Sequence, residues 1–285
     1  MFWLSWKGAE MWPKWRRFLW KLNFAFIALL LVLSLVFLIF IYPERAPVIL
    51  MYHSITKDAA SNIALPVDTF ACQLEFLSKH GYQIVPLGSL VKLIKEGKSV
   101  PPKWVVLTFD DGFADFYDYA YPLILKERIP VTLFIYVSGV GDVDKLSWEK
   151  LSALDPKLVE IGAHSLSHRS LIFLKEDERK DEVLACRLIL ENKLHRRVRF
   201  FSYPFGAVDQ GLMGLVEQSG FQAAVGTAYR LGEFKGSSVY LLKRVFVSKA
   251  SQYPFVFRFM VSGYYVPVRQ LLYRVFNLKV PRDRG

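Results

Sequence analysis

Short apolar runs alternate with stretches of helical periodicity through the middle of the chain. Runs rich in β-branched and aromatic residues predict strands at 47–52, 83–85, 104–109, 131–136, 159–162, 199–203, 221–225 and 240–247. Stretches with helical periodicity lie between them, for example at 68–80, 114–128, 175–194 and 208–219. This alternation predicts an α/β fold, a βα barrel that forms one domain over residues 44–252.

The start of the chain has a different pattern. Residues 22–43 contain no charged side chain, and a helix of this length extends about 33 Å, against about 30 Å of bilayer hydrocarbon. No small-x-small cleavage site follows, which favours an uncleaved transmembrane signal anchor over a cleaved signal peptide. Residues 1–21 carry several tryptophans and five basic side chains against one acidic one, which predicts a cytoplasmic N-terminus. The following domain would then be extracytoplasmic, in a periplasm or at the cell surface.

The end of the chain, residues 253–285, is aromatic and basic, with six basic side chains against one acidic one. Most of the net charge of +11 therefore lies at the two ends. The balanced middle argues against a nucleic-acid-binding domain, which would carry its basic stripe on the folded core. The apolar side chains of this tail have two interpretations, a helix at a membrane interface or ordinary packing on the domain. They are Phe255, Val256, Phe259, Met260, Leu271, Leu272, Val275 and Phe276.

Two polar motifs each follow a predicted strand. Asp110 and Asp111 end the run at 104–109, and Gly112 breaks that strand. His164 and His168 follow the run at 159–162, and their spacing lets them share one helical turn. Parallel barrels gather the carboxyl ends of their strands at one face, so these side chains are expected to share a site.

Two imidazoles and one carboxylate match the ligand count of a catalytic zinc-type site, which keeps one position open. We expect Asp111, His164 and His168 to bind a divalent metal ion, which leaves Asp110 as a general base toward water that the ion activates. Each motif alone is also explained by a solvated turn or a pair of surface histidines. Zinc is the first expectation for the metal, with iron, cobalt and nickel as alternatives.

Three segments together resemble a known family. The segments 108–112 and 164–168 resemble the first two motifs of the polysaccharide deacetylases, the NodB-like carbohydrate esterases. The segment 201–206 resembles the third motif, which implies that the backbone amide of Phe205 helps to hold an oxyanion. The resemblance covers residues 47–247, and it implies a distorted, incomplete barrel of about seven strands.

The chain departs from the family pattern in two places. Many members carry an arginine where this chain has Ser202, and that arginine orients the catalytic aspartate. Arg244, in a segment that resembles a late strand of the family, is the candidate replacement, although a solvated arginine at a strand end explains it as well. The usual histidine after the third motif is also missing. His195 looks like part of a basic surface turn, so His53 becomes the candidate general acid, because an ordinary histidine carries a proton near neutral pH.

The segment around His53 resembles the opening strand of the poly-N-acetylglucosamine deacetylases, in which the late motif is permuted to the front. The resemblance implies an enzyme that removes N-acetyl groups from a cell-surface polysaccharide containing N-acetylglucosamine. Peptidoglycan is the alternative substrate, and a catalytically silent polysaccharide-binding subunit is the alternative function. The expected partners are the polysaccharide, the membrane and machinery that makes or exports the polymer.

The two cysteines, Cys72 and Cys186, lie in predicted helices with apolar neighbours. An exported domain permits one disulfide between them. Two separate buried thiols are the favoured interpretation, because neither cysteine has the closely spaced partners of a metal site.

Overall fold

The structure is a computed structural model that describes residues 11–37, 47–227 and 238–276. The chain divides into two compact units, residues 1–45 and residues 46–285. The division between a catalytic domain and a tail at residue 252 remains a prediction.

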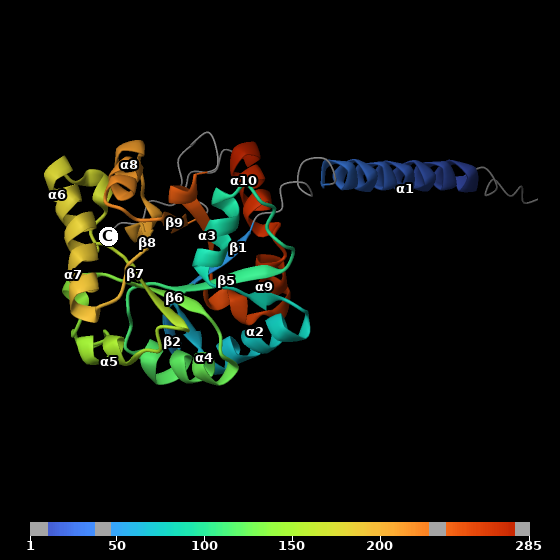
Figure 1. The fold of residues 1–285 in the computed structure, drawn as a ribbon. Coiled ribbons are helices and arrows are strands. Elements are labelled where there is room, and N and C mark those ends of the chain that lie inside the picture. Colours follow the sequence, from blue (N-terminus) through green and yellow to red (C-terminus); the bar gives the residue numbers. More distant parts are fainter. Residues whose placement is uncertain (1–10, 38–46, 228–237, 277–285) are drawn as a thin grey trace, which may run out of the picture. The chain divides into compact units, whose positions relative to one another are not determined.

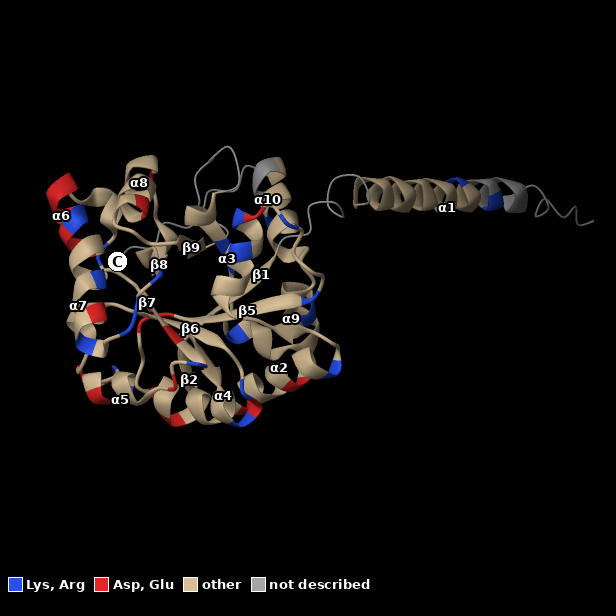
Figure 2. Cartoon of the chain, viewed as in Figure 1, with Lys and Arg blue, Asp and Glu red and all other residues tan. Residues whose placement is uncertain are grey.

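The described part of the first unit is a single helix, α1 (Met11–Val36). Its segment Phe18–Val36 is long and apolar enough to cross a membrane. Figure 2 shows that the basic residues of α1 lie in its N-terminal part, whereas the rest of the helix carries no charge. Residues 38–43 of the predicted anchor and residues 1–10 lie outside the described residues.

The second unit is built on parallel strands (Figure 1). Hydrogen bonds link them in the order β1-β10-β9-β8-β7-β6-β5, and β1 also pairs with β5, which closes a ring of seven. The predicted parallel barrel of seven strands is therefore confirmed. The short strand β4 (Gln83–Ile84) pairs with the start of β5 outside the ring. The ring strands are β1 (Val48–Tyr52), β5 (Trp104–Phe109), β6 (Val131–Ile135), β7 (Val159–Ala163), β8 (Phe200–Ser202), β9 (Ala223–Thr227) and β10 (Leu242–Phe246).

Helices cover the outside of the ring and pack on the larger of two buried apolar clusters. The predicted helix at 114–128 is a π-helical turn followed by α4, and the one at 175–194 is α6, a π-helical turn and α7. The helices that pack on this cluster are α2 (Val67–Lys79), α4 (Tyr121–Glu127), α5 (Trp148–Ala153), α7 (Cys186–Leu194) and α8 (Gln210–Gln218), whereas α6 (Glu176–Lys180) has no buried residue.

The second apolar cluster lies on the opposite side of the same strands, because successive side chains of a strand point to opposite faces. Ile49, Val106, Phe134 and Phe200 belong to it. The helix α3 (Leu87–Lys95), which the sequence did not predict, packs its buried side on these residues. Apolar side chains thus fill the inside of the barrel below the site, which lies at the carboxyl ends of the strands.

Elements outside the ring complete the unit. A small parallel pair, β2 (Ser54–Thr56) and β3 (Ala64–Pro66), follows β1. The C-terminal helices α9 (Pro254–Val261) and α10 (Tyr265–Phe276) bury Phe257, Met260, Val261 and Val266, so part of the tail packs on the domain. Other tail positions are exposed, and residues 277–285 lie outside the described residues.

The two cysteines are free. Cys186 is buried, as expected, but Cys72 is exposed. The expectation of a buried Cys72 was wrong because Phe70 and Leu74 occupy the inner face of α2 and leave Cys72 on its outer side.

Candidate metal centre and active site

A cleft of about 570 Å³ opens at the carboxyl ends of the barrel strands. All the site residues that the sequence predicted line this cleft, namely His53, Asp110, Asp111, His164, His168, Phe205 and Arg244. They come from five of the strands, β1, β5, β7, β8 and β10, or from the loops that follow them. His195, by contrast, is exposed at the end of α7 and does not line the cleft.

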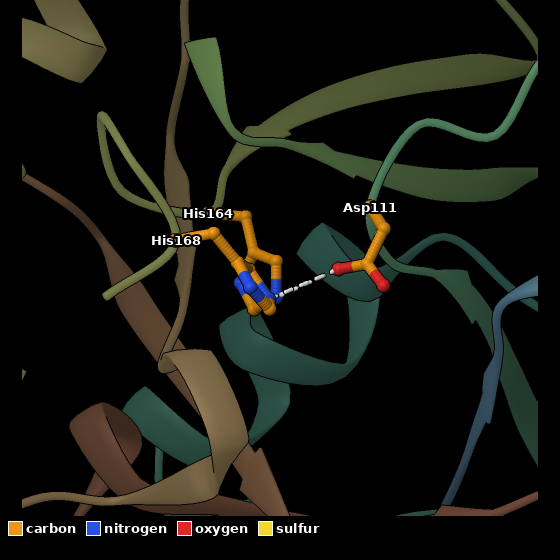
Figure 3. A group of neighbouring side chains, drawn as sticks. All are labelled: Asp111, His164 and His168. Carbon is orange, nitrogen blue, oxygen red and sulfur yellow. Dashed lines mark ion pairs between the residues drawn. The ribbon is translucent and has the colours of Figure 1, made fainter. Parts of the chain in front are cut away.

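Asp111, His164 and His168 form a compact triad (Figure 3). The Oδ1 atom of Asp111 lies 3.4 Å from Nε2 of His164 and 3.2 Å from Nε2 of His168. Two ligands about 2.1 Å from one tetrahedral ion lie about 3.4 Å apart, so the observed separations fit a zinc-type ion. The segment between the histidines is a loop, which corrects the expected helical turn.

The hydrogen bonds around the triad also favour a cation. His164 Nδ1 lies 2.8 Å from the carbonyl oxygen of Ser202, and a neutral ring that donates this bond presents the lone pair of Nε2 to Asp111. Oδ1 of Asp111 is buried and has no hydrogen-bond partner among the described residues. Two acceptors that face each other at this distance are stabilised when a positive ion binds between them.

The backbone turns Asp111 toward the histidines. Its φ is +71°, and Gly112 follows with a φ of +62°. Two successive residues in the left-handed region make a sharp turn directly after β5, which separates the directions of the two neighbouring carboxylates. A Cβ on Gly112 would lie 2.7 Å from the terminal methyl of Ile135, and together with the positive φ this favours glycine at this position.

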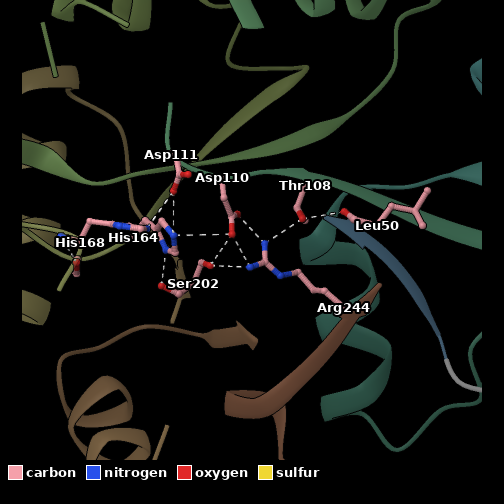
Figure 4. A network of polar contacts seen from close by, with 9 residues as sticks. Leu50, Thr108, Asp110, Asp111, His164, His168, Ser202 and Arg244 are labelled. Carbon is pink, nitrogen blue, oxygen red and sulfur yellow. Dashed lines mark hydrogen bonds and ion pairs between the residues drawn. The ribbon is translucent and has the colours of Figure 1, made fainter. Parts of the chain in front are cut away.

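Asp110 is buried next to the triad, 3.8 Å from Nε2 of His164, but its hydrogen bonds are made to other side chains (Figure 4). Arg244 donates to its two carboxylate oxygens over 2.7 and 2.6 Å, and the hydroxyl of Ser202 lies 3.2 Å from Oδ2. Arg244 also donates to Ser202 Oγ and to Thr108 Oγ1. These side chains come from β5, β8 and β10 and meet inside the barrel. A paired, hydrogen-bonded charge is the arrangement that a buried carboxylate needs.

Neighbouring charges shift the pKa values of Asp110, Asp111 and His164. Burial by itself raises the pKa of Asp110, but Arg244 and His164 outweigh burial and hold this pKa below the usual value. Burial also opposes ionisation of Asp111, and the two histidines again lower its pKa. The pKa of His164 is raised, because the nearby carboxylates outweigh the effect of burial. Since Arg244 balances Asp110, the charge of Asp111 remains to attract a cation.

His53 follows β1 and contacts Phe246, with ring centroids 5.5 Å apart. Its Nδ1 is buried without a hydrogen-bond partner among the described residues. Burial lowers its pKa, although Asp110 and Asp111 act in the opposite direction. The sequence argument assumed an ordinary histidine pKa and was wrong on this point, because it could not include desolvation by the barrel.

Phe205 lies in a short turn after β8, with a φ of +57°. Gly206 follows at +67°, and a Cβ there would lie 2.1 Å from Thr227 Oγ1. This close approach to β9 fixes the turn, whose aromatic side chain packs 4.8 Å from the ring of His168. The backbone of Phe205 is thereby held at the edge of the cleft.

Two further residues of the cleft were not predicted from the sequence. Tyr265 and Arg269 line it from α10, and Arg269 donates to the Tyr265 hydroxyl over 2.7 Å. The (i, i+4) spacing of the two residues predicts that they share a helix face, but only the packing of α10 shows that this face lines the cleft.

Comparison with known proteins agrees with this geometry. A family model described as polysaccharide deacetylase matches residues 97–224, which include the triad, Asp110 and Phe205. The chain carries a polysaccharide deacetylase domain. His53 and Arg244 lie outside the matched segment of the deacetylase domain, although both line its cleft.

Individual relatives extend the similarity. The Bacillus subtilis protein YxkH is 28% identical over 206 residues, which are 72% of this chain and 72% of that protein. The poly-β-1,6-N-acetyl-D-glucosamine N-deacetylase of Escherichia coli is 34% identical over 91 residues, 31% of this chain and 14% of that protein. The E. coli match therefore covers a small part of a much longer protein.

Solved structures share the fold of the deacetylase domain. IcaB from Ammonifex degensii superposes with a TM-score of 0.64 at 24% identity, over 76% of this chain and 97% of that one. The Streptococcus pyogenes deacetylase PplD, solved with acetate, has the same TM-score at 22% identity and covers 71% of this chain and 92% of that one.

Proposed function

We propose that this protein is a metal-dependent N-deacetylase that acts on an N-acetylglucosamine polysaccharide at the cell surface. The observation that carries this proposal is the separation of two neighbouring carboxylates. Asp111 faces the two histidines, whereas Asp110 is held by Arg244 in the same cleft. One carboxylate is therefore available to a cation and the other to a proton of the reacting water.

The reaction forms a bond between a water oxygen and the acetyl carbon and breaks the bond from this carbon to the sugar nitrogen. Asp110 accepts a proton from the water, and its ion pair with Arg244 keeps it ionised and oriented for this role. A divalent cation held by Asp111, His164 and His168, with zinc as the first candidate, would supply Lewis-acid polarisation. The site thus keeps the binding of the cation and the transfer of the proton on separate side chains.

The backbone amide of Phe205 and the imidazole of His53, which also line the cleft, complete the proposed reaction. The backbone amide of Phe205 donates to the oxygen of the acetyl group as negative charge develops there. His53 delivers a proton to the departing nitrogen; because burial lowers its pKa, the ring takes up this proton from solvent before the bond to nitrogen breaks, and the protonated ring is then a stronger acid. Arg244 orients Asp110 through its two hydrogen bonds to the carboxylate.

The choice of substrate rests on the relatives. The E. coli relative is named for poly-β-1,6-N-acetyl-D-glucosamine, and proteins of the same name from Staphylococcus aureus are 22% identical over 212 residues. This favours a poly-N-acetylglucosamine-like polymer over peptidoglycan. A catalytically silent polysaccharide-binding subunit is disfavoured, because it has no use for the oriented carboxylate of Asp110.

The proposed location rests on α1. A helix that is long and apolar enough to span a bilayer, with its basic residues toward the N-terminus, supports a signal anchor with the N-terminus in the cytoplasm. The deacetylase domain would then face outside, where the polysaccharide and the machinery that makes or exports it are found.

Acetate release from N-acetylglucosamine oligomers by the full chain in detergent tests the proposal. Chelation should abolish release, and adding back single divalent metals should restore it and identify the working ion. Asp110→Asn should reduce turnover at least 100-fold while the metal content stays the same. Acetate release by Asp110→Asn at the parent rate would reject Asp110 as the base. A folded, metal-loaded chain that releases no acetate would favour the binding role.

A further inference from the structure

The loop between the two candidate histidine ligands has a backbone that its residues do not favour on their own. Ser165 has a φ of +69° and His168 a φ of +58°. A non-glycine residue in the left-handed region costs about 1 kcal/mol or more, so other contacts must hold this conformation. The directions in which His164 and His168 point depend on those contacts.

One buried carboxylate makes several of them, alongside bonds from Val137, Ser138 and His168 to Ser165 and Leu166. Glu182 Oε2 accepts hydrogen bonds from the backbone amides of Leu166 and Ser167, each over 2.9 Å. Its other oxygen, Oε1, accepts from the hydroxyl of Ser167 and from Arg169 over 3.2 Å. Glu182 thus binds the loop at two consecutive amides and one side chain, midway between the two histidines.

Glu182 reaches the loop because of a local irregularity in the helix that carries it. The π-helical turn Asp181–Ala185 lies between α6 and α7, and such turns often occur at functional sites. Glu182 is 2% exposed, a burial that few carboxylates have unless their oxygens are fully paired. The loop amides and Arg169 provide this pairing, so the carboxylate and the loop stabilise each other.

We propose that Glu182 is a positioning residue that sets the geometry of the candidate metal centre. It does not contact the triad, and it acts by fixing the loop so that both imidazoles face Asp111. This inference rests on the proposed cation site. Loss of a residue that orients metal ligands typically weakens binding 10–100-fold, and a similar loss is expected here.

The experiment is a titration of the full chain in detergent with Co²⁺, followed by its visible absorption, and with Zn²⁺ in competition. Glu182→Gln keeps the shape of the side chain but removes one acceptor oxygen and the charge. We expect its Kd for both ions to rise about 10–100-fold, with kcat near the parent value once metal is saturating. Ser167→Ala removes only the hydroxyl contact and should raise the Kd less, which keeps the test valid if Glu182→Gln folds poorly.

Glu178→Gln is the matched control. Glu178 lies one turn earlier and also contacts Arg169, over 3.3 Å, but it makes no bond to the loop amides. Its metal affinity should equal that of the parent. Parent-like affinity in Glu182→Gln, with only a lower melting temperature, would overturn the inference and leave Glu182 a structural residue. If the parent chain itself binds neither ion, the proposed metal site fails instead, so the two failures are distinguishable.

Discussion

Replacement of Arg244 by methionine tests how much the ion pair between Arg244 and Asp110 contributes to the free energy of unfolding. Arg244 is 1% exposed and donates to both oxygens of Asp110, which is 2% exposed. Methionine fills much of the same space but has no donor, so the charge of Asp110 would remain buried without a partner. Breaking one side of a buried ion pair costs about 3–5 kcal/mol. We expect the free energy of unfolding to fall by this amount.

Urea unfolding of the full chain in detergent, followed by circular dichroism, measures this loss. The double variant Asp110→Asn/Arg244→Met removes both charges, so its loss should be smaller than the sum of the single losses by about 2 kcal/mol. Arg258→Met changes an exposed arginine on α9 and should have little effect. A coupling energy below about 0.5 kcal/mol would refute the view that the two side chains stabilise each other.

Two further variants test the walls of the cleft. Gly206→Ala should lower kcat and destabilise the protein by about 2 kcal/mol, because the new Cβ meets Thr227 at a φ of +67°. Gly214→Ala in α8 has open space and should be neutral or stabilising, and equal losses in both glycine variants would contradict this reasoning. Arg269→Gln should raise the KM for oligomers about fivefold with kcat unchanged, because one hydrogen bond of about 1 kcal/mol to bound sugar is lost. The Arg258→Gln control should keep the parent KM, and a fall in kcat for Arg269→Gln would mean that Arg269 acts on the chemistry.

Local pattern was sufficient to predict the barrel. The strand β5 is a continuous apolar run because both of its faces are buried, so its bounds were predicted without error. The helix α3 was missed although its buried residues Leu87, Leu90 and Val91 have helical spacing; only its packing on the inner cluster depends on how the ring closes. The loop from His164 to His168 was expected to be helical, since spacing alone does not reveal the left-handed residues within it.

The site was predictable where it depends on strand ends and unpredictable where it depends on contacts between distant segments. Asp111 and the two histidines each follow a strand, so the rule for parallel barrels brings them together. The burial that lowers the pKa of His53 comes from the assembled barrel and has no signal in the local sequence. The same is true of Glu182, which reaches the ligand loop through a π-helical turn.

The position of Arg244 follows from the alternation of side chains in the barrel. Along β5, Val106 packs with the inner cluster, Thr108 accepts a bond from Arg244, and Asp110 ends the same inward row. Side chains at the carboxyl ends of strands across the barrel also reach Asp110. Ser202 on β8 and Arg244 on β10 both do so, at the same Oδ2 atom. In this chain Arg244 on β10 makes the ion pair and Ser202 on β8 adds a hydroxyl contact, so a different strand takes the role that the family resemblance assigns to position 202.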